Sequence, residues 1–277
     1  MKKIIFFVFL SVFQCLFSQK YRFVYEYKMV TDISKPDSLT TDYMNLDTDG
    51  KKSFFYNATK YETDSSYASA NEFKVLANAK NFDLNLNYSI EKDSQNKLMN
   101  FYTNYKGLEI VIPETEFPVW KLQSEYQEIE KMRCQKAIVQ YKGRNWEAWF
   151  TASIPVSDGP YKFSGLPGLI VKINDTENQH IFELIQVKKL QDLYFSVPKH
   201  PKKMTEKEYK KLMENFSYNF ATDVESVNMT SNGMSIKLKD GGYKNFSSDE
   251  LKKYGASGKT DEEIAKRLRR TNNPIER

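Results

Sequence analysis

The sequence predicts a mainly β (α+β) protein that contains one antiparallel sheet and a single well-defined helix. Short segments of alternating apolar and polar residues follow one another from residue 20 onward, separated by turn residues. Aromatic residues make up 14% of the chain, including 18 Tyr and 19 Phe, a bias suited to half-buried strands. The chain has 277 residues, of which 40% are hydrophobic, and we expect residues 19–277 to form a single domain.

The first 18 residues have the pattern of a secretory signal peptide. Lys2 and Lys3 form a basic start, an apolar run follows from Ile4 to Phe17, and Ser18 is a small residue at the expected cut. The run is too short to span a membrane, and no later run is long and apolar enough to do so. We therefore expect an exported protein that is periplasmic, secreted or associated with the outer membrane.

Charge and cysteine content limit the range of partners. The formal net charge is +5, and it becomes +3 when Lys2 and Lys3 leave with the signal peptide. Charges of both signs are interspersed, so no nucleic-acid partner is expected. Loss of Cys15 with the signal peptide would leave Cys134 alone and exclude an internal disulfide. We expect Cys134 to be a small buried hydrophobe, with a reactive thiol as the alternative.

The N-terminal half has the pattern of a strand meander. The segment Lys20–Val30 alternates cleanly and places Tyr21, Phe23, Tyr25, Tyr27 and Met29 on one face. Further strands are expected at Thr40–Leu46, Lys51–Tyr56, Asp83–Glu91, Lys97–Tyr105 and Leu108–Pro113. The cluster Asp47–Gly50 predicts a hairpin turn, because it lacks the ligand spacing and closing Glu of a calcium loop. The polar segment Asn57–Asn71 predicts a long loop.

The second half continues the sheet and then changes character. Strands are expected at Cys134–Tyr141, Trp146–Ser153, Ile181–Leu190, Leu193–Val197 and Met234–Leu238. The pattern of Glu114–Gln127 is less clear. Lys142–Asn145 predicts a hairpin turn, and Trp146 and Trp149 are expected in the core, with a bowl lining as the alternative. Charged helical segments are expected at Asp249–Tyr254 and Asp261–Arg270, in a short helical tail.

One helix is predicted from Thr205 to about Tyr218. The sequence Thr205-Glu206-Lys207-Glu208 is a capping box, in which the first and last residues satisfy each other's backbone N–H groups. An apolar stripe follows at helical spacing and comprises Tyr209, Leu212, Met213, Phe216 and Phe220. We expect this stripe to pack on the sheet; a partner helix or a membrane surface is the alternative.

The most distinctive stretch is Gly159–Asp175. Leu166-Pro167-Gly168-Leu169 predicts a type II turn, because proline fixes φ near −65° and glycine accepts the positive φ at the next position. Leu169–Ile173 then predicts a strand with Lys172 turned outward. The expected role of the stretch is a corner that reverses the chain over the core, and the alternative is a rigid loop that lines a pocket.

Gly165-Leu166-Pro167-Gly168-Leu169-Ile170 matches the motif that gives the GLPGLI family of Bacteroidota its name, and the chain resembles that family. Other pieces that resemble it are Cys134–Ala137, Gly143-Arg144 with Trp146, Ala148–Thr151, Ile154-Pro155, Gly159-Pro160 and Asn273–Glu276. Phe150 stands where the family pattern has tyrosine. The resemblance implies a strongly curved sheet, an open half-barrel or bowl, packed by the helix. It implies no catalytic residues, because the family has no settled activity.

No catalytic, cofactor or metal site is predicted. His180 and His200 share no local spacing with a second ligand, so zinc has no support, and a soft-metal site from Cys134, Met132 and a distant histidine is a remote alternative. A nucleophile elbow and a glycine-rich phosphate loop are both absent from the sequence. A paired acid and base cannot be selected among the carboxylates of a β-rich chain.

Three classes of function remain, each with a structural sign. The first is a non-enzymatic binding or carrier protein of the cell envelope for an apolar or peptide-like ligand, which predicts a deep aromatic cavity. The second is a module that binds another envelope protein, which predicts a filled core and an exposed apolar patch. The third and least favoured is a hydrolase-type enzyme, which predicts convergent polar groups with perturbed pKa values in a cleft.

Overall fold

The computed structural model describes most of the chain after the first 18 residues. The described residues are 19–31, 33–34, 36–37, 39–58, 86, 88–105, 107–193, 195–214, 223–230, 233–239, 243–249, 251–252 and 273–276. The predicted signal peptide, most of the predicted loop Asn57–Asn71 and the predicted helical segment Asp261–Arg270 lie outside these residues.

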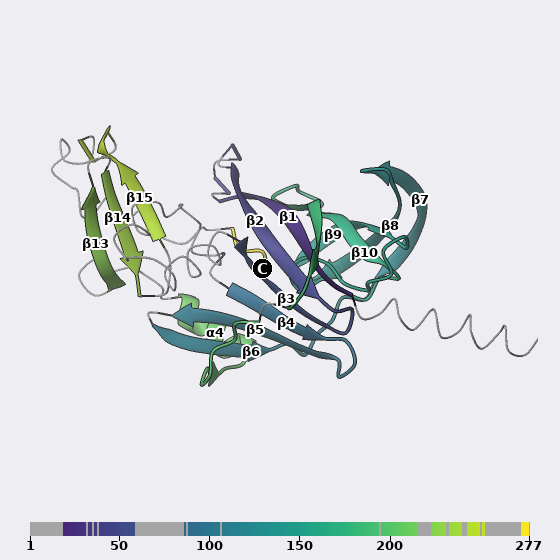
Figure 1. Ribbon diagram of the computed structural model, residues 1–277, viewed down its shortest axis with the longest axis horizontal. Helices are drawn as coiled ribbons and strands as arrows, with labels where there is room; N and C mark the ends of the chain where they lie inside the picture. The colour runs from purple at the N-terminus through teal and green to yellow at the C-terminus, as the bar shows by residue number, and fades with distance from the viewer. Residues whose placement is uncertain are drawn as a thin grey trace, which may run out of the picture.

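Twelve strands form one large sheet (Figure 1), in the order β12-β6-β5-β4-β3-β2-β1-β11-β10-β9-β8-β7. The strands are β1 (Lys20–Val30), β2 (Leu39–Thr48), β3 (Lys52–Asn57), β4 (Tyr88–Asp93), β5 (Leu98–Tyr105), β6 (Leu108–Pro113), β7 (Lys121–Ile129), β8 (Met132–Tyr141), β9 (Arg144–Thr151), β10 (Leu169–Asp175), β11 (His180–Leu190) and β12 (Lys202–Lys203). Every neighbouring pair is antiparallel except β12 and β6. The sheet is not closed, and the prediction of a mainly β protein with a large antiparallel sheet is confirmed.

The strand order has a simple explanation in short hairpins. From β1 at the centre, β2 to β6 add one after another toward one edge. The chain then crosses to the other edge, and β7 to β11 return step by step until β11 pairs with the free side of β1. Residues 114–120, which form no strand, make this crossing. The crossing explains why Glu114–Gln127 has no single pattern, since only its last part belongs to β7.

The hairpin turns follow the predicted turn chemistry. Lys142 and Gly143 join β8 to β9 with φ of 50° and 80°, the pattern of a two-residue turn that matches the strand twist. Between β2 and β3, one Asp49 carboxylate oxygen accepts hydrogen bonds from the backbone N–H groups of Lys51 and Lys52, each at 2.8 Å. Both predicted hairpins are confirmed.

The predicted strand Leu193–Val197 is wrong. The described residues of this segment, Leu193 and Phe195–Val197, form no strand. Both sides of β11 are already paired, with β1 and with β10, so no free edge remains beside it. The Phe195 ring instead lies 5.5 Å from the ring of Phe54, between centroids.

A helix and a second, small sheet follow. Helix α4 (Glu206–Glu214) begins with the predicted capping box: the Glu208 N–H donates to Thr205 Oγ1 at 3.2 Å, and the Thr205 N–H donates to Glu208 Oε2 at 2.7 Å. None of its residues is fully buried. Strands β13 (Val224–Thr230), β14 (Gly233–Leu238) and β15 (Tyr243–Ser247) form the separate antiparallel sheet in Figure 1.

The core lies against one face of the large sheet and contains both predicted tryptophans. Trp146 and Trp149 are buried, and the Trp146 ring contacts that of Phe163 at 4.7 Å between centroids. Cys134 is also fully buried, as predicted, and burial raises the pKa of its thiol. The tryptophans therefore stabilise the fold by burial, as predicted.

The turn at Pro167 is tighter than the predicted type II turn. The Gly168 N–H donates to Leu166 O at 2.8 Å, which closes a three-residue turn, while the Leu169 N–H donates to Ile154 O at 3.1 Å. Gly168 has the expected positive φ, but at 148°. The backbone approaches so closely here that a Cβ on Gly168 would lie 2.1 Å from the carbonyl oxygen of Thr151.

We expect Gly168→Ala to destabilise the fold at least twice as much as Gly165→Ala. Both glycines have positive φ, but a Cβ on Gly165 would meet nothing within 4 Å. Gly165→Ala therefore isolates the backbone term, about 1–2 kcal/mol. Urea denaturation of both variants measures the difference, and equal losses would contradict the close approach to Thr151.

Candidate functional site

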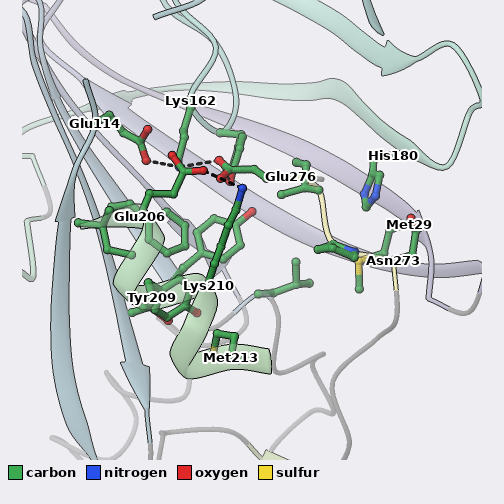
Figure 2. A pocket seen from close by; sticks show the side chains of 18 of the residues that line it. Met29, Glu114, Lys162, His180, Glu206, Tyr209, Lys210, Met213, Asn273 and Glu276 are labelled. Atoms are coloured by element: carbon green, nitrogen blue, oxygen red, sulfur yellow. Dashed lines mark hydrogen bonds and ion pairs between the residues drawn. The ribbon is translucent and has the colours of Figure 1, made fainter. Parts of the chain in front are cut away.

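A cavity of about 620 Å³ lies against the large sheet, beside α4 and the segment Asn273–Glu276 (Figure 2). Its apolar wall comprises Met29, Leu86, Phe101, Ile112, Tyr209 and Met213. The charged residues Glu114, Lys162, Glu206 and Glu276 gather at one end, and His180 and Asn273 lie at the other. The cavity thus combines an aromatic and aliphatic wall with a polar end, which is the usual composition of a ligand site.

The loop that forms the polar end is held by a buried lysine of β4. Lys92 Nζ donates to the carbonyl oxygens of Gly159 at 2.7 Å and Tyr161 at 3.0 Å, and it pairs with Asp158 at 2.5 Å. A third carbonyl, that of Phe163, lies 3.5 Å away. Burial lowers the pKa of Lys92, and the Asp158 charge acts in the opposite direction. The ammonium group therefore fixes the backbone of residues 158–163.

Next to this loop, five ionised side chains form a continuous chain of ion pairs. Glu114, which follows β6, pairs with Lys162 of the loop and with Lys142 of the β8–β9 turn, the latter at 3.1 Å. Lys162 also pairs with Glu276 at 2.5 Å, and Lys142 pairs with Glu206 at the start of α4. Glu114, Lys142 and Lys162 are almost wholly buried, so each needs its partners to offset desolvation.

The pairing at the helix start keeps both partners ionised at neutral pH. Burial by itself would raise the pKa of Glu206, but the hydrogen bonds from Lys142 and Lys210 outweigh it and lower that pKa to about 2. Burial would also lower the pKa of Lys142, but its bond to Glu206 and the charge of Glu114 raise it instead. Glu206 is consequently a fixed negative charge at the cavity edge.

Two buried tyrosines line the same end and stay protonated. Burial and the Glu276 charge raise the pKa of Tyr88 and of Tyr161. The Tyr161 hydroxyl donates to Glu276 Oε1 at 2.6 Å. The Tyr88 hydroxyl is buried without a hydrogen-bond partner among the described residues. Tyr161 also has a φ of 52°, which is unusual for a bulky residue.

The segment Asn273–Glu276 forms one wall of the cavity and is anchored by Arg144 of β9. Arg144 Nη2 donates to Asn273 Oδ1 at 2.5 Å and to Pro274 O at 2.8 Å, while its Nη1 donates to Asp175 Oδ2 at 2.8 Å. Asn273 Nδ2 in turn donates to the carbonyl oxygen of Val30 in β1, at 2.7 Å. Both ends of the Asn273 amide are therefore bound by the sheet.

The residues considered for metal binding do not come together. His180 is buried in the cavity wall, where its Nδ1 and the Tyr27 hydroxyl are 2.7 Å apart, whereas His200 is exposed. Cys134 lies in the hydrophobic core. Within the described ranges, no group of three or more His, Cys, Asp or Glu side chains could hold a metal ion.

The sequence did not reveal most of the residues that build the site, although the alternative given for Gly159–Asp175, a rigid loop that lines a pocket, includes Tyr161 and Lys162 of the cavity lining. Glu114, Lys142 and Lys162 come from segments far apart in the chain, and nothing in their local sequence marks them as partners. Lys92 sits in an ordinary alternating strand, and only its unexpected burial reveals its role. A usable signal existed for Arg144 and Asn273, because both belong to the motif pieces of the family that the chain resembles.

Comparisons with known proteins found a family of unknown function that matches part of the chain and a solved protein with a similar fold. Residues 90–172 match the family described as "Protein of unknown function (Porph_ging)". The structure is similar to PNGF-II in two crystal forms, with a TM-score of 0.51 and 15% sequence identity over 79% of this chain and 40% of that chain. The chain thus spans about two fifths of the length of the solved protein, and the likeness shows the fold alone. None of the curated proteins is significantly similar.

As to the membrane, the helical residues that the structure describes include no helix that is both long and apolar enough to span a bilayer.

We expect Lys92→Met to lower the free energy of unfolding by about 3–5 kcal/mol, because it leaves the buried Asp158 carboxylate without its cation. The double variant Lys92→Met/Asp158→Asn should recover part of that loss. Lys52→Met in the neighbouring strand is the control, since Lys52 is exposed and its pair with Asp93 is 3.8 Å long. Chemical denaturation measures all three, and a loss for Lys92→Met no larger than for Lys52→Met would refute the role of Lys92.

The low pKa of Glu206 predicts a defined loss of stability in acid. Its folded-state pKa is about 2 and its ordinary value is 4.5, so its contribution is complete above pH 4.5 and disappears as pH falls toward 2. Thermal unfolding of Glu206→Gln and wild type should differ at pH 7, and the difference should shrink across that window. Glu214→Gln on the same helix is the control. A wild-type advantage that stays constant down to pH 2 would contradict the ion pairs of Glu206.

Proposed function

We propose that this chain is a non-enzymatic binding or carrier protein of the cell envelope, exported and of the GLPGLI type, that holds an apolar or peptide-like ligand. The observation that carries the proposal is the cavity of about 620 Å³ with its aromatic and aliphatic wall. Its size falls within the range of about 300–1,000 Å³ that small-ligand sites occupy.

A strongly curved sheet, an open half-barrel or bowl, accounts for the position of the cavity. Eight strands lie between β6 and β8 in the sheet order. Glu114, which directly follows β6, nevertheless lies 3.1 Å from Lys142 in the turn after β8, between the carboxylate and the ammonium group. A sheet that brings such distant strands together has to bend around the space between them, and that space is where the ligand would bind.

The state of the charged groups favours binding over catalysis. Glu114, Glu206, Glu276, Lys142 and Lys162 are all engaged in ion pairs with one another. A general acid or base needs a pKa near the working pH, whereas the pKa of Glu206 is about 2 and that of Lys142 is raised. A hydrolase-type enzyme therefore remains the least favoured alternative, although the cavity does gather polar groups.

We expect Met213→Trp to weaken binding of an apolar fluorescent probe such as N-phenyl-1-naphthylamine by at least about tenfold. Met213 lines the cavity from α4, and an indole ring there would fill part of it. A tenfold loss of affinity corresponds to about 1.4 kcal/mol of binding free energy. Fluorescence titration of wild type and variant measures the two affinities.

The matched control is Lys211→Trp, which adds the same ring to an exposed position of the same helix. It should leave probe affinity unchanged. If the wild-type protein does not bind the probe, or if both tryptophan variants weaken it equally, the cavity is not a ligand site.

A module that binds another envelope protein is the second candidate, because the edge strand β7 and the segment before it expose apolar side chains. Val119 is 83% exposed and Leu122 is 52% exposed, and an unpaired strand edge can add a strand from a partner. Cross-linking in intact cells tests this candidate. An adduct with a partner protein that is lost in Leu122→Lys but still forms in Met213→Trp would favour the interaction module over the carrier protein.

A further inference from the structure

The segment Asn273–Glu276 lines the cavity, and the residues around it bind it as they would bind a peptide ligand. Arg144 donates hydrogen bonds to the Asn273 side chain and to the Pro274 carbonyl oxygen. The Asn273 side chain in turn donates to the Val30 carbonyl oxygen. The carboxylate of the segment's last residue, Glu276, pairs with the Lys162 ammonium group at 2.5 Å and accepts a hydrogen bond from the Tyr161 hydroxyl at 2.6 Å. A side-chain amide, a backbone carbonyl and a carboxylate are thus all recognised within four residues.

The residues that bind the segment are also held in place by contacts with other parts of the protein. Arg144 is fixed by Asp175 at 2.8 Å and by Gln179 at 3.1 Å. Lys162 keeps its ion pair with Glu114. The Tyr161 backbone, which has the unusual φ of 52°, is bound by Lys92. Strain that the surrounding structure imposes is common at ligand sites, because it fixes side chains in the geometry that binding needs.

The charge balance specifies what the site accepts. Lys162 is almost wholly buried and has two carboxylate partners, Glu114 and Glu276. Lys142 also pairs with Glu114, so removal of Glu276 would leave the two buried lysines sharing that carboxylate. A buried cation gains from a carboxylate of its own, so the site favours an occupant with one anionic group.

We propose that the place now filled by Asn273–Glu276 is a binding site for an extended peptide of a partner protein that carries an acidic side chain, and that this segment occupies it as a built-in competitor. The proposal rests on the proposed binding function and names its ligand class. A partner peptide binds when it replaces the segment: an amide or hydroxyl side chain meets Arg144 and the Val30 carbonyl, and a carboxylate three positions later meets Lys162 and Tyr161. The apolar wall receives the remaining side chains of the peptide.

The probe is a fluorescein-labelled peptide, Thr-Asn-Asn-Pro-Ile-Glu-Arg, with blocked ends, which copies residues 271–277. The variant Asn273→Ala/Glu276→Ala in the full chain removes the anchors of the built-in competitor. A site occupied in cis for more than nine tenths of the time gains at least about tenfold in apparent affinity when it is vacated. We therefore expect the double variant to bind the probe at least about tenfold more tightly than wild type, by fluorescence anisotropy.

Several controls make the outcome specific. Asn145→Ala/Glu128→Ala places the same substitutions at exposed positions and should bind the probe as wild type does. A probe with alanine for the second asparagine and glutamine for the glutamate should not bind. If the double variant does not fold, Glu276→Gln alone, which removes the charge at nearly constant volume, should still give a smaller gain.

The results that overturn the proposal differ from those that overturn the carrier function. A folded variant that binds N-phenyl-1-naphthylamine but gains no affinity for the peptide shows a structural segment in a working cavity. Displacement of the peptide probe by a long-chain fatty acid but not by unlabelled peptide would assign the site to lipid. A wild-type dimer that the double variant loses would identify the occupant as a second copy of the chain.

Discussion

The buried ammonium group of Lys92 is the contact on which the site depends. It comes from β4 and binds the backbone of a loop that is about 70 residues away in sequence, at Gly159 and Tyr161, as well as the Asp158 carboxylate. A lysine ammonium group has three donors, so burying one requires several acceptors at once. The loop supplies them from its own carbonyls, and its path over the sheet is fixed as a result.

Fixing this loop sets the positions of the charged groups beyond it. Lys162 directly follows Tyr161 and meets Glu114 and Glu276, which join the β6 end and the segment Asn273–Glu276 to the loop. The chain of ion pairs continues through Lys142 to the start of α4. Removing one partner of a buried ion pair leaves an uncompensated charge, so each of these contacts constrains the position of its neighbours. These ion pairs hold five segments at defined positions around the charged end of the cavity: the β6 end, the β8–β9 turn, the loop, the start of α4 and Asn273–Glu276.

The sequence predicted the parts of the fold that local patterns control. Alternation placed β1 and the hairpins, and the capping box placed the start of α4. It failed where the outcome depended on neighbours: Leu193–Val197 has a strand pattern but no free sheet edge, and Pro167-Gly168 has type II chemistry but a tighter turn against Thr151. The contacts of the candidate site were beyond local patterns, because Lys92, Glu114 and Lys162 acquire their roles through partners that are 28 to 114 positions away. Of the site residues, Arg144 and the Asn273–Glu276 segment belonged to recognisable motif pieces, and Tyr161 and Lys162 belonged to the distinctive stretch Gly159–Asp175.

The central claim is that the chain binds a ligand in this cavity, and native mass spectrometry of the protein purified from the cells that make it tests that claim most directly. We expect a stoichiometric adduct, released at moderate collision energy, whose mass identifies an apolar molecule or a peptide. The same adduct should be depleted in Met213→Trp. A bare protein mass under gentle conditions, or a mass increased only by a second folded polypeptide, would contradict the binding account and assign the chain to the class of interaction modules.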